Sequence, residues 1–320
     1  MKIFRSLVVA ACAAGACLTA AAQAYPQQPI KVILPFTAGG GTDGVTRIIT
    51  EPLGKALGQT VVIDYKAGAN TIIGAQTVAA ARPDGYTLLA TMDMTATILP
   101  SVYSKLPFDP LKDLVPVAML ARVPALFLAH PKVPASNLKE LVEYSKRNPG
   151  KLNYGSAVLY GQVLGQQLKT VSGLDYTYVP YKGAPEAVQG LLGGHLDFMM
   201  LDIATGLNFI KDGRLKALAI TAPQRHPQLP NVPTVGEMGW PELEMSVWYG
   251  LFAPAGTPPA VIEKVNAGVA KVVADPAIRK RLADLGHEVS DLSPAQVQEV
   301  IRKDGAKWGK AAREGNIRLD

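Results

Sequence analysis

The chain has 320 residues, of which 48% are hydrophobic and 18% are charged, and its formal net charge is +6. A chain of this length can bury a sizeable hydrophobic core without disulfides. No run of lysine or arginine marks a nucleic-acid-binding stripe, so the mildly basic composition excludes that class of partner and favours a globular protein.

The N-terminus has the pattern of a cleavable export signal. Lys2 and Arg5 precede an alanine-rich apolar stretch, and Ala22-Gln23-Ala24 matches a small-x-small cleavage site. We therefore predict that residues 1–24 are a signal peptide and that the mature protein is periplasmic. Cleavage removes both cysteines, which excludes disulfides, thiolate nucleophiles and cysteine metal sites from the mature chain, and lowers the net charge from +6 to +4.

After the signal, short β-branched runs alternate with helical patterns, which is typical of an α/β fold with mostly parallel sheets and flanking helices. The first unit is a strand over 30–34, a loop over 35–41, a helix with apolar residues from Val45 to Leu57, and strands over 61–63 and 85–91. An apolar run over 117–129 follows. Further strands are predicted over 152–154, 176–180, 196–201 and 216–221, between helices over 136–148, 160–171 and 185–192.

Helix caps divide the remaining sequence. Ser136 is predicted to cap the helix that it begins, and Thr257-Pro258, Asp275-Pro276 and Ser293-Pro294 each place a capping residue before a proline at the first helical position. These signals predict C-terminal helices that pack back on the first part of the chain. We expect two lobes, the first made of residues 25–123 plus 247–320 and the second of residues 124–246.

A glycine-rich loop is the strongest local signal of a binding site. Gly39, Gly40 and Gly41 lie between a strand and a helix, and Thr42 or Asp43 is placed to cap that helix. The free N–H groups of a helix N-terminus bind anions, and a carboxylate fits such a site. A tight turn in which the glycines serve only geometry is the alternative.

The same loop matches a dinucleotide-binding fingerprint, with glycines at 39, 41 and 44 and Asp64 at the end of the next strand. Four residues, 35–38, separate the strand from the first glycine, although the fingerprint requires the turn to follow directly. The export signal also argues against a nicotinamide cofactor. We predict no cofactor.

Polar residues follow several strands of the second lobe. Ser156 follows one strand, Tyr181 and Lys182 another, and Asp202 a third. Lys182 as a solvated loop residue and Asp202 as a helix cap remain alternatives, and the aromatic pair Trp248-Tyr249 suits either a ligand pocket or core packing.

Catalytic and metal-binding patterns are scarce. The four histidines are scattered without metal-ligand spacing, and Ser156 does not lie in a Gly-x-Ser-x-Gly elbow. The sequence therefore supports no enzyme class and predicts no metal site.

The motifs, taken in order, resemble the Bug-type periplasmic substrate-binding proteins of tripartite tricarboxylate transporters. The resemblance covers the whole mature chain. It rests on PFTAGGGTD with Arg47, VVIDYKAGA at 61–69, PDGYTL at 83–88, LNYGS at 152–156, VPYKG at 179–183, LGG at 192–194, PTVGE at 233–237 and APAGTP at 253–258.

The resemblance implies a two-lobed, Venus-flytrap fold of type II that holds a carboxylate between the lobes. It also implies the membrane subunits of such a transporter as partners. The ligand-binding residues that we predict are Phe36, Thr37, Ala38, Gly39, Gly40, Gly41, Thr42, Asp43, Met92, Ser156, Ala157, Val158, Tyr160, Tyr181, Lys182 and Asp202.

One departure from the family pattern concerns the ligand. After Gly-Ser-x the family usually continues with Gly-x-Gly and a downstream histidine, whereas this chain has Val158, Leu159, Tyr160 and Gly161, with Leu164 in place of the histidine. The added bulk argues against a compact citrate-like ligand and favours a mono- or dicarboxylate with an apolar or aromatic body, with Tyr160 as a wall of the site. A monomer is expected. A ligand-sensing partner of a sensor kinase and an exported hydrolase using Ser156 are the alternative functions.

Overall fold

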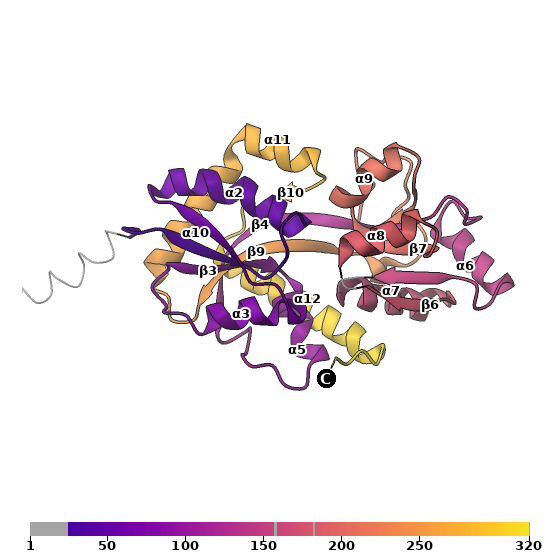
Figure 1. Cartoon of the computed structure of the whole chain (residues 1–320), viewed down its shortest axis with the longest axis horizontal. Coiled ribbons are helices and arrows are strands. Elements are labelled where there is room, and N and C mark those ends of the chain that lie inside the picture. The colour runs from indigo at the N-terminus through magenta and orange to yellow at the C-terminus, as the bar shows by residue number, and fades with distance from the viewer. Residues whose placement is uncertain (1–24, 157–158, 182, 320) are drawn as a thin grey trace, which may run out of the picture.

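The computed structural model describes residues 25–156, 159–181 and 183–319. Two groups of helices and strands lie side by side and are joined by two long central strands, β4 (Leu114–Ala129) and β9 (Ser246–Pro254) (Figure 1). The strands are ordered β2-β1-β3-β9-β4-β7-β5-β6, and β8 and β10 pair with β4 off this path. The outer strands of each lobe are parallel, whereas β4 and β9 pair antiparallel with their neighbours.

The first lobe is built on three parallel strands with helices on both sides of the sheet. Apolar residues of its first helix recur at helical spacing and are buried, as a face packed on a sheet requires. The elements are β1 (Ile30–Leu34), α2 (Gly41–Leu57), β2 (Val61–Tyr65), the 3₁₀ turn η1 (Ala69–Thr71), α3 (Ile72–Ala79), β3 (Thr87–Met92), α4 (Met94–Thr97) and α5 (Leu99–Val102).

Both lobes share strand β4. From Leu114 to Pro124 it pairs with β9, and from Ala125 to Ala129 it pairs with β7 and β8. Its register against β9 shifts twice, near Pro116 and near Met119, and such irregularities bend and twist a strand. A single bent strand thus connects the two sheets.

The second lobe repeats the alternation of strands and helices. Its elements are α6 (Leu138–Arg147), β5 (Asn153–Ser156), α7 (Leu159–Ser172), β6 (Thr177–Pro180), α8 (Ala184–Leu192), β7 (Phe198–Asp202), α9 (Ile203–Lys211) and β8 (Lys216–Ile220). The chain then returns through η2 (Pro241–Leu243) and β9.

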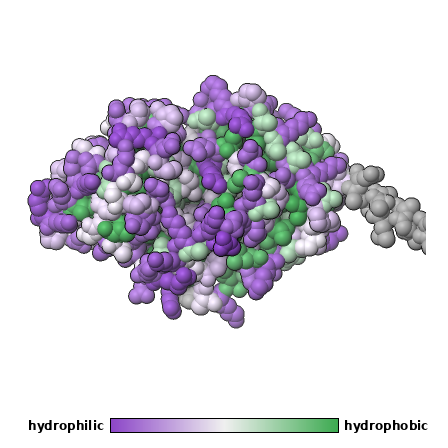
Figure 2. All heavy atoms as spheres, turned by 180° about the vertical axis from the view of Figure 1, so that it is seen from behind, coloured by the Kyte–Doolittle hydropathy of each residue, from purple (hydrophilic) through white to green (hydrophobic). Residues whose placement is uncertain are grey.

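The C-terminal segment covers the first lobe and reaches the second. It comprises α10 (Pro259–Ala274), α11 (Pro276–Asp284), β10 (Glu288–Val289) and α12 (Pro294–Glu314). Helix α10 packs on α2, and α12 packs on β4 and contacts α7 of the second lobe. Figure 2 shows the molecule from behind, where polar residues cover most of the surface and apolar residues gather mainly over the first lobe. No helix in the described ranges is long and apolar enough to cross a membrane.

Two of the four predicted caps are confirmed and two are wrong. The side chains of Asp275 and Ser293 accept hydrogen bonds from the first turns of α11 and α12. Asn137 caps helix α6, and Ser136 does not. The side chain of Asn137 accepts from the N–H of Glu140, and the carboxylate of Glu140 accepts in turn from the N–H of Ser136. Helix α10 begins at Pro259, since the residue before a proline is disfavoured in helical geometry, so Thr257 lies outside the helix.

Candidate functional site

The glycine loop leaves the N-terminus of α2 without a side-chain cap. Gly40 occupies the capping position and has no side chain to accept a hydrogen bond, and Gly39 before it has φ +89°, a conformation that favours glycine. The first N–H groups of any helix have no acceptor within the helix. At this end of α2 they belong to the exposed Gly40, the half-buried Gly41 and the buried Thr42 and Asp43, and such free donors are what an anion site requires.

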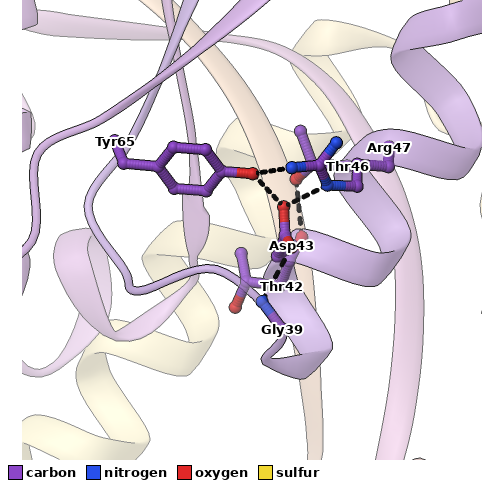
Figure 3. A network of polar contacts seen from close by, with 6 residues as sticks. All are labelled: Gly39, Thr42, Asp43, Thr46, Arg47 and Tyr65. Carbon is purple, nitrogen blue, oxygen red and sulfur yellow. Dashed lines mark hydrogen bonds and ion pairs between the residues drawn. The ribbon is translucent and has the colours of Figure 1, made fainter.

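Asp43 does not cap α2, contrary to the prediction, but lies inside its first turn. Its Oδ2 accepts from the N–H of Gly39 at 2.8 Å, and its Oδ1 accepts from the hydroxyl of Tyr65 at 2.7 Å and from Nε of Arg47 at 2.9 Å (Figure 3). The guanidinium of Arg47 also bonds the Tyr65 hydroxyl. Burial opposes ionisation of this carboxyl, but these bonds outweigh it and lower the pKa of Asp43. Asp43 therefore holds the glycine loop in place.

Asp202 lies across from the loop, at the start of α9. It caps that helix, which is one of the two roles that the sequence allowed. Its Oδ1 accepts from the N–H of Thr205 at 2.8 Å, and its Oδ2 accepts from the hydroxyl of Thr205 at 3.1 Å. Burial raises the pKa of Asp202 despite these bonds. The cap therefore fixes a carboxylate of the second lobe in an environment that disfavours its charge.

Tyr249, on β9, brings the two sides together. A Cβ placed on Gly41 would lie 3.1 Å from the hydroxyl oxygen of Tyr249 and 3.9 Å from Oδ2 of Asp202. The side chain of Tyr249 is 2% exposed, and its hydroxyl makes no hydrogen bond with another residue in the described ranges. The neighbouring Trp248 is packed in the core. The N-terminus of α2, the hydroxyl of Tyr249 and Asp202 thus converge on one point.

His287 completes the packing around this point. Its ring lies edge-on to that of Tyr249, with centroids 5.5 Å apart, and the side chain is buried with no partner for Nδ1. Burial lowers the pKa of His287 to about 4. The preceding turn at Gly286 packs against Ile203, the first residue of α9, so this loop also spans the two lobes.

A second group of polar side chains lies where the two lobes meet near β5 and β6. It surrounds a cavity of about 130 Å³ lined by Asn70, Ser156, Leu159, Gln162, Tyr178, Tyr181 and Leu319. The sequence predicted only Ser156 and Tyr181 of this set. Asn70 comes from the first lobe and has φ +50° between two further residues with positive φ, a strained geometry that is common at functional sites.

Tyr160 does not line the ligand site, contrary to the prediction. Its side chain is fully buried, its hydroxyl donates to Asp93, and its ring lies edge-on to Trp308 at 6.0 Å. Side chains in the first turn of a helix point back toward the N-terminus, which directs Tyr160 into the interface between the lobes. It does not form a wall that a ligand can touch in this conformation.

The other predicted residues vary in exposure. Thr37, Ala38, Gly39 and Gly40 are exposed, Phe36, Gly41 and Met92 are half-buried, and Thr42 is buried. Ala157, Val158 and Lys182 lie outside the described residues. The sequence did not identify Tyr249 as a site residue, since it left that aromatic pair between pocket and core, and it passed over His287. A tyrosine inside an otherwise apolar strand was the available signal.

Comparison with known proteins gives the family. Residues 45–317 match the tripartite tricarboxylate transporter family receptor. The structure of the periplasmic binding protein BugD is 33% identical and covers 92% of this chain and 100% of its own, with a TM-score of 0.84. An R. palustris protein solved with adipate (30% identity, 92% and 99% covered, TM-score 0.86) and MatC from Rhodopseudomonas palustris with bound malate (34%, 90% and 99%, 0.82) are also similar.

These similarities confirm the predicted two-lobed binding-protein fold. With the family match over most of its length and Bug proteins among its relatives, the chain belongs to the tripartite tricarboxylate transporter receptors, the Bug-type periplasmic solute-binding proteins.

Proposed function

We propose that this protein captures a small carboxylate between its two lobes and delivers it to the membrane subunits of a tripartite tricarboxylate transporter, without catalysing a reaction. One observation carries the proposal: the uncapped N-terminus of α2 meets the hydroxyl of the buried residue Tyr249, which makes no hydrogen bond with another described residue. Amide donors and a positive helix end stabilise an anion by about 0.3–2 kcal/mol, and the hydroxyl adds a further donor. The similar proteins with adipate and malate support a carboxylate as the ligand class.

The cavity between the lobes has a mainly polar lining with a smaller apolar part. Leu159, Tyr178, Tyr181 and Leu319 line it together with three polar side chains. A mono- or dicarboxylate with a hydrocarbon body matches both the polar and the apolar part.

Delivery requires the protein to signal that it is loaded. A ligand that contacts both lobes favours the closed arrangement, and closure is what a membrane partner recognises. We propose lobes of residues 25–123 plus 247–320 and 124–246, which move about β4 and β9, in a monomer exported by means of residues 1–24. The pairing of β4 with strands of both sheets supports this division.

A matched pair of glycine variants tests the proposal. Gly41→Ala places a methyl group 3.1 Å from the Tyr249 hydroxyl, whereas Gly40→Ala meets nothing closer than 4.0 Å. Calorimetric titration and thermal shift with a panel of carboxylates, including adipate and malate, should show that the natural protein binds at least one of them. At 100 times the dissociation constant, a ligand adds about 2.7 kcal/mol of stability.

Gly41→Ala should weaken that binding by at least about ten-fold, which corresponds to about 1.4 kcal/mol, while Gly40→Ala stays close to the natural protein. Both variants should melt within a few degrees of it. If no carboxylate binds, or if Gly41→Ala binds as well as Gly40→Ala, the proposed site is wrong.

A further inference from the structure

We infer that Tyr249 and Asp202 make this site selective for a carboxylate that stands alone, so that monocarboxylates and long-chain dicarboxylates bind while closely spaced polyanions are rejected. The inference rests on the proposed function, since it concerns the ligand of that same site. Tyr249 supplies attraction for one carboxylate group, and Asp202 supplies repulsion against a second one near it.

The hydroxyl of Tyr249 is placed to donate to the first carboxylate. Tyr249 is a buried residue, its hydroxyl makes no hydrogen bond with another described residue, and a ligand oxygen in front of Gly41 could accept one from it. The ring has little freedom to turn away, because β9 is paired on both sides at this residue, with Met92 and with Ala121, and His287 packs against its face. The hydroxyl is therefore held next to the N-terminus of α2.

Asp202 differs from Asp43 in the compensation of its charge. The carboxylate of Asp43 accepts hydrogen bonds from the guanidinium of Arg47, the hydroxyl of Tyr65 and the N–H of Gly39. Asp202 receives only the two neutral donors of Thr205 and forms no ion pair with another residue in the part of the chain that the structure describes. Its Oδ2 nevertheless lies near the same point in front of Gly41 as the Tyr249 hydroxyl.

An uncompensated charge at this position discriminates by the spacing of charges on the ligand. Coulomb repulsion falls with distance, and in a partly buried site solvent screens it weakly. One carboxylate bound by the amides of α2 and by Tyr249 gains more than it loses to Asp202. A second carboxylate within a few bonds of the first also lies close to Asp202 and is repelled, whereas one at the end of a hydrocarbon chain lies farther away.

A ligand series tests this selectivity in the full mature chain. Calorimetric titrations would compare malonate, succinate, glutarate, adipate, pimelate, citrate and hexanoate. In the natural protein, adipate and hexanoate should bind at least about ten-fold more tightly than malonate and citrate. In Asp202→Asn the ratio of these affinities should fall to within about three-fold. The variant should keep the native structure, because asparagine is also a favoured helix cap.

Two further variants separate the roles. Tyr249→Phe should weaken every ligand that binds by about ten-fold and leave the ratio unchanged, since the donor is lost but the charge remains. Asp64→Asn, which removes a carboxylate at the edge strand β2, controls for net charge and should keep the natural ratio. The inference is overturned if malonate and citrate bind the natural protein as tightly as adipate, or if Asp202→Asn keeps the natural ratio. In either case the proposed function stands, because carboxylates still bind; binding of none of the series would overturn both.

Discussion

The hydroxyl of Tyr160, on α7 of the second lobe, donates a hydrogen bond to the carboxylate of Asp93, which follows β3 in the first lobe. Both side chains are fully buried. Burial raises the pKa of Asp93, and the nearby Asp304 adds to this effect, so the phenol is the main group that supports the carboxylate from across the interface. The bond is a direct polar link between the lobes.

Removal of this hydroxyl should destabilise the protein. In Tyr160→Phe the carboxyl of Asp93 remains buried without its donor, and the free energy of unfolding should fall by about 1–3 kcal/mol. Urea unfolding followed by circular dichroism measures this change. Tyr144→Phe, which removes a hydroxyl with no partner among the described contacts, should change it by less than about 0.5 kcal/mol. Equal midpoints for both variants would show that the bond contributes nothing.

The Asp43 network should make stability depend on acid pH. Because the pKa of Asp43 is lowered on folding, its stabilisation is complete above the ordinary value of 3.8 and is lost as the pH falls through the folded pKa. Asp43→Asn should therefore lower the free energy of unfolding by about 1–3 kcal/mol near neutral pH, and the difference should shrink below about pH 4. Urea unfolding over a pH series tests this. A difference that stays constant down to about pH 2 would contradict the network.

His287 should act in a higher pH window. Its pKa falls from 6.5 to about 4 on folding, so between these values the unfolded chain binds more protons and the folded state loses stability as the pH is lowered. The full effect is about 3 kcal/mol. His287→Leu should remove this loss, and the free energy of unfolding of the two proteins should diverge between about pH 7 and pH 4. Carboxyls with a raised pKa, such as Asp202, change the stability in the opposite direction, but they do so equally in both proteins and cancel in the difference. If the free energies of unfolding of the two proteins change in parallel with pH, His287 does not cause this loss of stability.

The cap of α6 offers a test of two adjacent residues. Asn137→Ala removes the acceptor for the N–H of Glu140 and should cost about 1 kcal/mol, because that donor then lacks a partner within the protein. Ser136→Ala keeps the backbone N–H that bonds Glu140 and should cost less than about 0.5 kcal/mol. Thermal unfolding of the two variants distinguishes them, and a larger loss for Ser136→Ala would restore the cap that the sequence predicted.

Local patterns predicted most of the elements. The β-branched run at 30–34, the glycine loop and the helix after it are each specified by neighbouring residues, so they could be found without tertiary information. Strand β4 was harder, because Pro116 and Pro124 interrupt its apolar pattern although the strand runs through both. Prolines are tolerated there because the register shifts or the pairing partner changes nearby.

The candidate site was only partly predictable for a different reason. The glycine loop carries its own signal, since the chain must turn closely before a helix. Tyr249 carries only the weak signal of a tyrosine inside an apolar strand, and His287 carries none, because each lies in a segment whose local pattern describes a strand or a turn. They reach Gly41 and Asp202 only through the pairing of β9 with β3 and of β10 with β4. Such convergence is a property of the fold.

The passage of β4 through both sheets has a consequence for how the molecule folds. Neither half contains all the backbone that its own sheet requires, because one continuous strand supplies an inner member of each. Separate expression of either half would divide this strand from one set of partners and leave a row of amide and carbonyl groups unpaired. We therefore expect the two lobes to constitute one cooperative unit, which gains and loses its structure in a single transition.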